Sequence, residues 1–353
     1  MRRKFVTIRD VAAHAGVSVS TVSHVLNGND QHVGAATREQ VQAAVNALRY
    51  RPNAIARSMV KQKTATVGLV LTEVDNPLFM PVVAGVEEVL RPAGYHIVLA
   101  SAPDVTGEMQ AIETLRSQQV DGFIFMSLST CISNDHLVHL QDDGVPLVVI
   151  NRCIGDEAIN LVSWADREAG YTATKHLMTL GHTRIGTIRG PVESVPPRKS
   201  ASERHQGWLQ ALAEDDLPVV PHWIIDGHYT YEGGYQAAQQ LLAQYGPGQE
   251  RPTALFVASD VMAVGALKAL YDAGLCVPRD LAIVSTGDPP VAAYTVPALT
   301  TLSHPVYEAG HVAARMLLDG FTTGKAAATQ HITLSFFLKV RESCGARTKT
   351  AAP

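Results

Sequence analysis

The stretch Thr7–Asn27, TIRDVAAHAGVSVSTVSHVLN, contains two short helical patterns on either side of a glycine. Ile8 and Val11 lie at the spacing of one helical face. Gly16 tolerates the positive φ at which many helices end, and Ser18 is a good N-cap for a second helix. Two helices joined by a turn that contains glycine are typical of a helix-turn-helix.

The charge of the chain is unevenly distributed. Residues 1–63 hold ten Lys or Arg and three Asp or Glu, a net +7, whereas the other 290 residues hold 19 basic and 30 acidic residues, a net −11. A basic N-terminal unit on an acidic body indicates that this unit binds a polyanion such as DNA. An unevenly charged solvated surface is the alternative explanation for the charge alone.

The second helix of a helix-turn-helix enters the major groove and presents its N-terminal residues to base edges. Here the outward-facing candidates for base contacts are Val19, Ser20 and His24, and Thr21 and Ser23 are candidates for phosphate contacts.

Two further segments extend this basic unit. Residues 36–50, ATREQVQAAVNALRY, predict a third amphipathic helix, and Pro52 breaks the chain after it. Residues 53–59 predict a helix of about two turns, which is marginal unless it docks on a partner. Met59 is an apolar residue in a basic linker. It either packs against the body or acts as a wedge between base pairs in the minor groove.

The remaining chain alternates short apolar runs such as TVGLVL and HIVLAS with amphipathic segments of helical period. This alternation predicts doubly wound parallel sheets, an α/β fold, in two tandem units of similar size. Ligands on such sheets bind outside the carboxyl ends of the strands. The last ten residues, 344–353, are expected to be disordered.

The first 63 residues resemble the DNA-binding headpiece of the LacI/GalR (lactose-repressor) family of bacterial transcription regulators. The resemblance lies in TIRDVAAHAGVSVSTVSHVLN, TREQVQAAVNALRYRPNAIARSM and TATVGLVL. Segments such as DNPLF, VDGFI, LGHTRIGTIRGP and ASDVMAVGALKAL extend it over roughly residues 5–343. It implies a headpiece (1–63) with a hinge helix (53–59) and two lobes like those of periplasmic sugar-binding proteins. The implied first lobe comprises 64–162 and 293–325, and the second 163–292 and 326–343.

The resemblance also implies which residues meet DNA. The family's base-reading positions fall on Val19, Ser20 and His24, and Met59 occupies the place of the family's usual wedge leucine. The expected DNA-binding set is Thr7, Ser18, Val19, Ser20, Thr21, Ser23, His24, Asn27, Asn53, Ala56, Arg57 and Met59.

A small-molecule effector is expected between the lobes. Carboxylates and arginines can form paired hydrogen bonds with adjacent hydroxyls, and aromatic faces cover the apolar side of a sugar. Trp164 either stacks on the ligand or packs in the core, and Ser259 and Ala165 depart from the family's usual residues. The expected effector-binding residues, which lie at predicted strand ends and where the family's contacts fall, are Asn76, Phe79, Ser127, Arg152, Arg204, Tyr229, Asp260 and Asp288.

Other classes of protein are less well supported. The sequence contains no Walker-type loop, HExxH or GxSxG, and His136 and His139 lack evident partner ligands, so we expect no enzyme, cofactor or metal. There is no apolar run long enough to span a membrane and no secretory signal, which predicts a cytoplasmic protein at the nucleoid. The four widely separated cysteines are expected to be reduced.

These observations predict a homodimeric repressor of carbohydrate-uptake or catabolic genes that binds a palindromic operator and is switched by a sugar. Two alternatives stay open. The ligand could be a purine, a nucleoside or a phosphorylated metabolite, for which Arg152, Arg189 and Arg204 offer positive charge. A solute receptor is the other alternative, but the basic front end argues against it.

Overall fold

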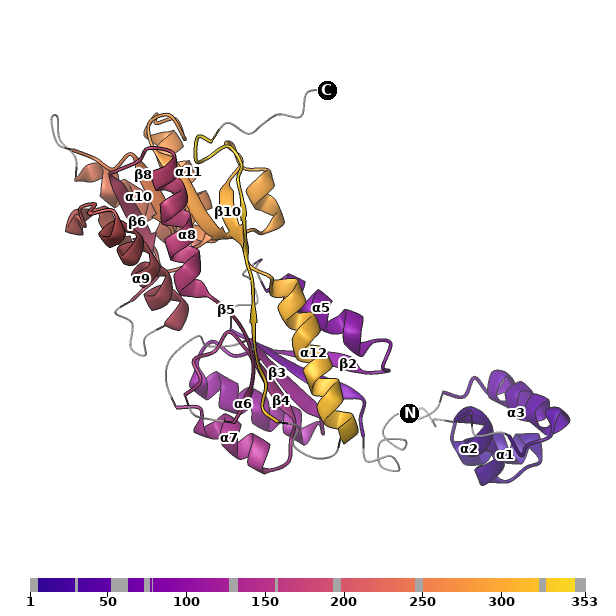
Figure 1. The fold of residues 1–353 in the computed structure, drawn as a ribbon. Coiled ribbons are helices and arrows are strands. Elements are labelled where there is room, and N and C mark those ends of the chain that lie inside the picture. Colours follow the sequence, from indigo (N-terminus) through magenta and orange to yellow (C-terminus); the bar gives the residue numbers. More distant parts are fainter. Residues whose placement is uncertain are drawn as a thin grey trace. The chain divides into compact units, whose positions relative to one another are not determined.

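The computed structural model describes residues 6–28, 31–51, 63–72, 77, 79–126, 133–155, 158–192, 198–244, 250–323 and 328–346. The chain divides into two compact units, Met1–Thr64 and Ala65–Pro353, which are described separately below (Figure 1).

The described residues of the first unit form the helices α1 (Ile8–Ala15), α2 (Val19–Leu26) and α3 (Ala35–Ala47). Gly16 ends α1 with φ +67°, as the sequence predicts. The third helix begins at Ala35, before the expected start. The apolar faces meet in one small core, which contains the fully buried side chains of Val11, Val22 and Val41. The domain is therefore organised by the same periodic residues that mark its helices in the sequence.

The second unit contains two six-stranded sheets. The first has the order β11-β5-β4-β3-β1-β2, and all of its paired strands are parallel. Its strands are β1 (Thr66–Leu71), β2 (His96–Ser101), β3 (Gly122–Met126), β4 (Leu147–Ile150), β5 (Asn160–Trp164) and β11 (His331–Leu334).

Helices cover both faces of the first sheet. On one face α5 (Met80–Leu90) packs with α12 (Val306–Thr323), and on the other lie α6 (Val105–Ser117) and α7 (Asp135–Asp142) (Figure 1). Leu69 faces α5 and α12, whereas its neighbour Val70 faces α6 and α7. Burial on both faces explains why the strands read as continuous apolar runs.

The second sheet has the order β12-β10-β9-β8-β6-β7, and only the β10–β12 pair is antiparallel. Its strands are β6 (Ile185–Arg189), β7 (Ile224–Asp226), β8 (Ala254–Val257), β9 (Ala282–Gly287), β10 (Thr300–Ser303) and β12 (Phe337–Lys339). The helices packed with this sheet are α8 (Asp166–Thr179), α9 (Lys199–Glu214), α10 (Tyr231–Ala243) and α11 (Asp260–Asp272). The described part of this lobe also contains the 3₁₀ turns η1 (Pro221–Trp223) and η2 (Pro290–Ala293).

Close helix packing in the second lobe depends on glycine. A Cβ atom added at Gly170 in α8 would lie 2.1 Å from the backbone oxygen of Arg204 in α9. The two helices therefore approach to backbone contact, and this contact holds the N-terminal half of α8 beside Arg204.

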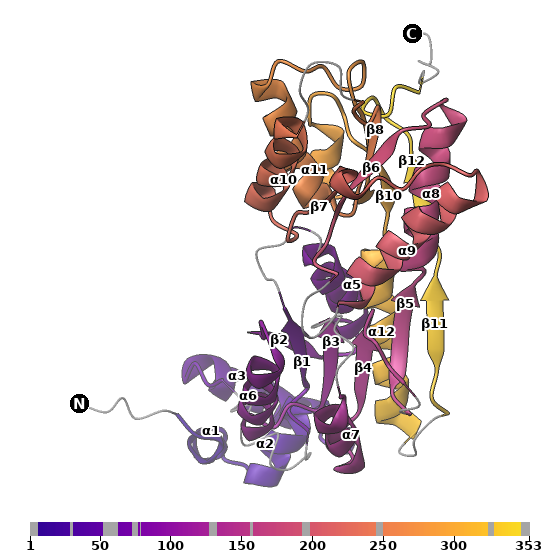
Figure 2. The same cartoon turned by 90° about the vertical axis from the view of Figure 1, so that its left-hand side faces the viewer.

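The chain passes between the two sheets three times, and two of the implied crossing points are wrong. The chain leaves the first sheet after β5, close to the implied point at 162. It returns at His304, between β10 and α12, rather than near 292, and leaves again at 335–336, between β11 and β12, rather than near 325 (Figure 2). Hydrogen-bonding partners decide which sheet a short strand joins, and an apolar run does not identify those partners.

Two smaller expectations are also corrected. Cys344 is 1% exposed and belongs to the core of the second lobe, so the ordered chain extends beyond 343; residues 347–353 lie outside the described part. Cys276 and Cys344 are free thiols, whereas Cys153 is disulfide-bonded. The expectation of reduced cysteines is therefore wrong for Cys153, since residues far apart along the chain can lie close together in space. No helix in the described ranges has the length and apolar character needed to cross a membrane.

Candidate functional site

Hydroxyl groups hold the N-terminal turn of α2. Ser18 is its N-cap, and the Ser18 Oγ accepts a hydrogen bond from the backbone N–H of Thr21 at 3.1 Å. The Ser18 hydroxyl also lies 2.7 Å from the Ser20 hydroxyl and 2.8 Å from the Thr21 hydroxyl. This network satisfies a helix end that would otherwise leave backbone donors unpaired, and it orders the turn predicted to face base pairs.

The predicted base-reading residues point to solvent. Val19, Ser20 and His24 are exposed, whereas Thr21 and Ser23 are half-buried. Val19 is 42% exposed although it is a large apolar residue at the start of a capped helix. An exposed apolar side chain here suits contact with a thymine methyl group in the major groove.

The remaining described DNA-binding candidates stabilise helix ends. Thr7 forms a capping box with Asp10 at the start of α1, and both the Thr7 N–H and its hydroxyl donate to Asp10 Oδ2 at 2.8 Å. Asn27 Nδ2 donates to the Ser23 carbonyl oxygen at 2.8 Å. Asn53, Ala56, Arg57 and Met59 lie outside the described residues.

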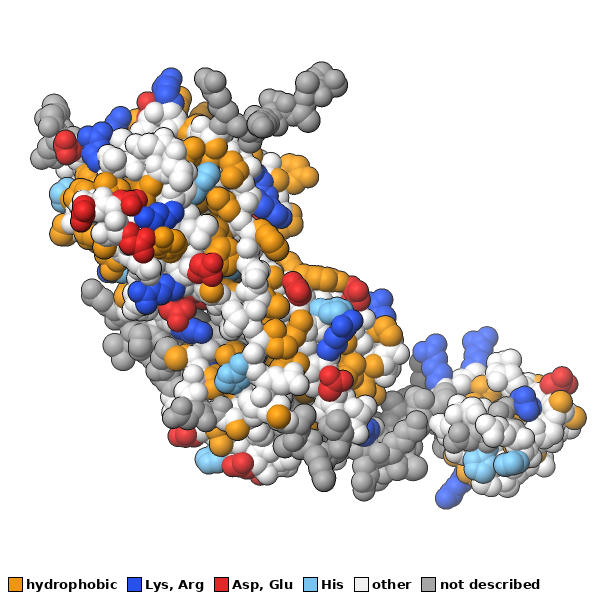
Figure 3. Space-filling view, viewed as in Figure 1, with side chains coloured by type: hydrophobic (Ala, Val, Ile, Leu, Met, Phe, Trp, Pro, Cys, Tyr) orange, Lys and Arg blue, Asp and Glu red, His pale blue; other side chains and the backbone are white. Residues whose placement is uncertain are grey.

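Several basic side chains are exposed on this domain. Lys and Arg side chains project from its surface in Figure 3. The exposed described ones are Arg9, Arg38, Arg49, Arg51 and Lys63. Exposed lysines and arginines of this kind are suited to phosphate contacts that carry no sequence preference.

Among the effector candidates of the first lobe, Arg152 is fully engaged in the protein interior. Its guanidinium is 1% exposed and donates to both carboxylate oxygens of Glu108, at 2.8 and 3.1 Å, and to Asn134 Oδ1 at 2.6 Å. The Arg152 charge is therefore compensated within its own lobe. Phe79 packs against the core of this lobe, and Asn76 and Ser127 lie outside the described residues.

Arg204 forms the central ion pair of the second lobe. Its Nε and Nη2 atoms lie 2.8 Å from Asp166 Oδ1, and its Nη1 donates to the carbonyl oxygen of Ala258 at 2.7 Å. Asp166 Oδ2 accepts from Asn151 Nδ2 at 3.0 Å. Burial alone would raise the pKa of Asp166, but the Arg204 charge and these hydrogen bonds outweigh it, and the pKa lies below its usual value.

Tyr229 lies next to this ion pair. Its ring stacks with the Arg198 guanidinium at 5.8 Å, and burial raises its pKa while the nearby Arg204 charge opposes the rise. Gly190 makes room for the ring, because a Cβ there would lie 2.3 Å from Tyr229 Cζ.

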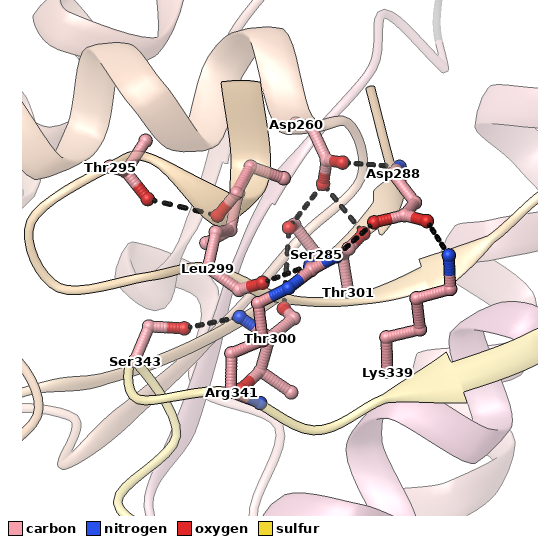
Figure 4. Close-up of polar contacts among 11 residues, drawn as sticks. Asp260, Ser285, Asp288, Thr295, Leu299, Thr300, Thr301, Lys339, Arg341 and Ser343 are labelled. Carbon is pink, nitrogen blue, oxygen red and sulfur yellow. Dashed lines mark hydrogen bonds and ion pairs between the residues drawn. The ribbon is translucent and has the colours of Figure 1, made fainter. Parts of the chain in front are cut away.

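Asp260 and Asp288 are held by groups of their own lobe (Figure 4). The Asp260 carboxylate accepts hydrogen bonds from Ser285, from Thr301 at 2.7 Å and from the Asp288 backbone N–H. Burial raises the pKa of Asp260 to about 6, against these hydrogen bonds.

The Asp288 carboxylate is ion-paired with Lys339 at 2.5 Å and with Arg341 at 2.6 Å. These two cations outweigh burial and lower the Asp288 pKa. Both Asp260 and Asp288 therefore stabilise the sheet edge formed by β9, β10 and β12.

The structure brings together Arg204, Tyr229 and Asp260, while Arg152 belongs to a separate network in the first lobe. Sequence reasoning missed two neighbours of the Asp166–Arg204 pair, Asn151 and His304. Asn151 bonds to Asp166, and the charges of both Asp166 and Arg204 act on His304. Trp164, for which the sequence allows either ligand stacking or core packing, is buried and packs against His304 with ring centroids 5.4 Å apart. A polar residue directly after an apolar strand was the available signal for Asn151.

Comparison with known proteins decides the family. A sequence profile described as "Bacterial regulatory proteins, lacI family" matches residues 7–53, and one described as "Periplasmic binding protein-like domain" matches residues 174–344. The ribose operon repressor of Haemophilus influenzae is 37% identical over 314 residues, which cover 89% of this chain and 91% of the relative. The chain belongs to the LacI family.

Solved structures agree with the assignment of this chain to the LacI family. The lac repressor dimer bound to operator and the anti-inducer ONPF has a TM-score of 0.83 at 28% identity, and the alignment covers 97% of this chain and 99% of the other. A complex of the transcriptional regulator CelR with cellobiose has a TM-score of 0.69 at 34% identity and covers 96% and 99%. Both comparisons span the DNA-binding domain and the two lobes.

Proposed function

We propose that this LacI-family protein is a transcriptional repressor that binds a palindromic operator as a homodimer and is controlled by a small molecule, most simply a sugar. The observation that carries the proposal is the start of α2. There a hydroxyl network holds the helix end, and Val19, Ser20 and His24 stand exposed on a basic domain. Expected targets are genes for carbohydrate uptake or catabolism.

DNA recognition in this proposal has two parts. Exposed lysines and arginines contribute salt-dependent affinity for any duplex. Val19, Ser20 and His24 add sequence choice, because small apolar and hydroxyl side chains suit a thymine methyl group or a single hydrogen bond to a base edge. A twofold dimer places two such helices on two half-sites, and this arrangement demands an inverted repeat.

Effector control in this proposal involves the body. Its support is the relationship to proteins whose names refer to ribose or whose structures contain cellobiose. The ligand would shift the two lobes relative to one another and so change the distance between the paired 53–59 segments, with Met59 as the minor-groove wedge. These segments lie outside the described residues.

We propose that the protein catalyses no reaction and that it acts in the cytoplasm. The Arg204, Asp260 and Asp288 groups are engaged in stabilising contacts within the lobe, and a regulator of genes acts where the DNA is.

The test is selection of bound duplexes from a random DNA library by the full-length protein, followed by footprinting. We expect an inverted repeat protected symmetrically. Val19→Ser should change base preference at one position in each half-site, whereas Gln42→Ala, an exposed change on α3, should leave the preference unchanged. Absence of an enriched inverted repeat, or equal effects of the two variants, would contradict the proposal.

A further inference from the structure

The first lobe contains a disulfide bond at Cys153. The sequence has four cysteines, and Cys276 and Cys344 are free thiols. The remaining cysteine, Cys131, is therefore the partner of Cys153 within the chain; it lies outside the described residues. Cys153 is half-buried, so it lies at the edge of the core rather than inside it.

The first lobe has a core of its own that needs no covalent cross-link. Clusters of buried apolar side chains cover both faces of its sheet, with Leu69 in one cluster and Phe125 in the other. Structural disulfides belong mainly to small secreted domains that cannot build a sufficient core. In the cytoplasm, the location proposed above, thiols are kept reduced, and disulfides there are mostly transient, catalytic or redox-sensing. The bond at Cys153 therefore suits a regulatory role better than a structural one.

The backbone of Cys153 is tied to the start of α7. Asn134, the N-cap residue of α7, is 2% exposed and donates from Nδ2 to the Cys153 carbonyl oxygen at 3.0 Å. Its Oδ1 accepts from Arg152 Nε at 2.6 Å. The Asn134 side chain makes no capping hydrogen bond to the helix that it begins, and both ends of its amide serve residues that follow β4. A shift of Cys153 would thus act directly on the first turn of α7.

A buried ion pair extends this connection to α6. Arg152, the residue before Cys153, is 1% exposed and pairs with Glu108 of α6, which is 0% exposed. His136 of α7 lies with its Nε2 2.7 Å from Glu108 Oε2. A buried polar network tolerates few arrangements, because each charge that loses its partner is costly. Closing or opening the bond at Cys153 would therefore favour one arrangement of β4, α6 and α7 over another.

Resting on the proposed function, we propose that the disulfide at Cys153 is a redox switch of operator binding. For oxidation, a peroxide converts one cysteine thiol to a sulfenic acid and releases water. The second thiol then condenses with the sulfenic acid, which forms the S–S bond and releases another water. For reduction, a dithiol attacks one sulfur, breaks the S–S bond through a mixed disulfide, and leaves two cysteine thiols and the oxidised dithiol. Two electrons and two protons are transferred in each direction.

The test uses the full-length protein and the operator selected from the random library. Oxidised protein is prepared with a limited amount of hydrogen peroxide and reduced protein with dithiothreitol, and both are measured under nitrogen after the reagent is removed. Cys153→Ser cannot form the bond, and Cys131→Ser is a second variant that removes the other half of it. Cys276→Ser, at an exposed free thiol, is the matched control.

The state of the bond is read by alkylation and peptide mapping. We expect Cys153 to be linked to Cys131 in the oxidised protein and both residues to be alkylated in the reduced protein. The linked fraction should change across the range of glutathione ratios that a cytosolic thiol pool covers. Hydrogen exchange in α7 should be faster in the reduced protein, because the Cys153 carbonyl is then held less firmly against Asn134.

Operator affinity is measured for both redox forms of each protein. The two forms of the wild type should differ by about fivefold or more, the lower end of a typical coupling between two sites. Both serine variants at the bond should bind the operator as the reduced wild type does, with or without peroxide. Cys276→Ser should respond to peroxide as the wild type does.

Four results would overturn the inference. They are absence of a linked peptide at Cys153 after oxidation, a bond that stays intact at every glutathione ratio, equal operator affinity of the two wild-type forms, and a response that persists in Cys153→Ser. Equal exchange in α7 would contradict the route through Asn134. If neither redox form selects an operator, the proposed function is contradicted. A selected operator that both forms bind equally contradicts this inference alone.

Discussion

The Asp166–Arg204 pair allows the effect of one substitution on stability to be worked out from the structure. Arg204→Met keeps an apolar stem of similar length and removes the charge. Asp166 is 0% exposed and the Arg204 side chain 7% exposed, so the carboxylate would stay in the interior, where Asn151 is its remaining hydrogen-bond partner among the described side chains. Leaving one partner of a buried ion pair uncompensated costs about 3–5 kcal/mol of unfolding free energy.

A matched control comes from an exposed pair. Arg116 and Asp143 form an ion pair at 2.6 Å, but their side chains are 46% and 51% exposed. Arg116→Met should therefore cost no more than about 1 kcal/mol. The comparison separates the loss of a charge from the loss of a charge in a buried setting.

The assay is urea unfolding followed by tryptophan fluorescence. All three tryptophans, Trp164, Trp208 and Trp223, belong to the second unit, so the signal reports the unfolding of the lobes. Asp166→Asn in the Arg204→Met background removes the uncompensated charge and should restore part of the loss.

The pH dependence gives a second check with a defined sign. In the wild type the folded-state pKa of Asp166 is lowered, so its contribution is present above the ordinary pKa and is lost as the pH falls through the folded value. Without Arg204, burial raises the Asp166 pKa, and protonation then relieves the penalty. The deficit of Arg204→Met should therefore be larger at pH 7 than at pH 4. A deficit no larger than that of Arg116→Met, or one that does not shrink at pH 4, would refute this reasoning.

Three further substitutions test other parts of the structure. Ser18→Ala removes the α2 cap and should cost about 1 kcal/mol, which is measured as faster hydrogen exchange in α2. The control Asp104→Ala removes the cap of α6 and should leave exchange in α2 unchanged. Equal exchange rates of α2 in the two variants would contradict the role of the Ser18 cap. Gly170→Ala places a Cβ against the backbone oxygen of Arg204 and should lower the unfolding free energy by about 1–3 kcal/mol or more; an unchanged urea midpoint would show that α8 and α9 separate easily. Asp260→Asn should gain unfolding free energy relative to the wild type as the pH rises from about 4 to about 7. The reason is that the Asp260 pKa is about 6 in the fold, so ionisation of this carboxyl destabilises the folded wild type. A difference in urea unfolding that does not change with pH would argue against the raised pKa.

The headpiece was predictable from sequence because its signals are local. Helical spacing placed Val11, Val22 and Val41 in one core, and the structure confirms it. Gly16 and Ser18 marked the helix end and the cap for reasons of backbone conformation and hydrogen bonding within three residues. The expected start of the third helix at residue 36 was one residue late, since Gly34 caps it without a side-chain bond.

The lobes were predictable as alternating strands and helices but not in their connections. The run at 300–303, TTLS, contains one apolar residue and does not identify its sheet, and its pairing with β9 and β12 assigns it to the second. The return at His304 therefore follows from hydrogen bonds between strands far apart in sequence.

The sequence by itself determined the fold class, the helix-turn-helix and its exposed face, because period, caps and charge are properties of neighbouring residues. Only the tertiary structure decided what the buried polar residues do. Arg204 meets Asp166 from 38 residues away, and Asp288 meets Arg341 from 53 residues away. His304, directly after β10, reaches the ring of Trp164 at the end of β5. Whether such a group binds a ligand or stabilises a sheet edge depends on which charged side chain it contacts. The packing of segments far apart in the sequence decides which side chain that is.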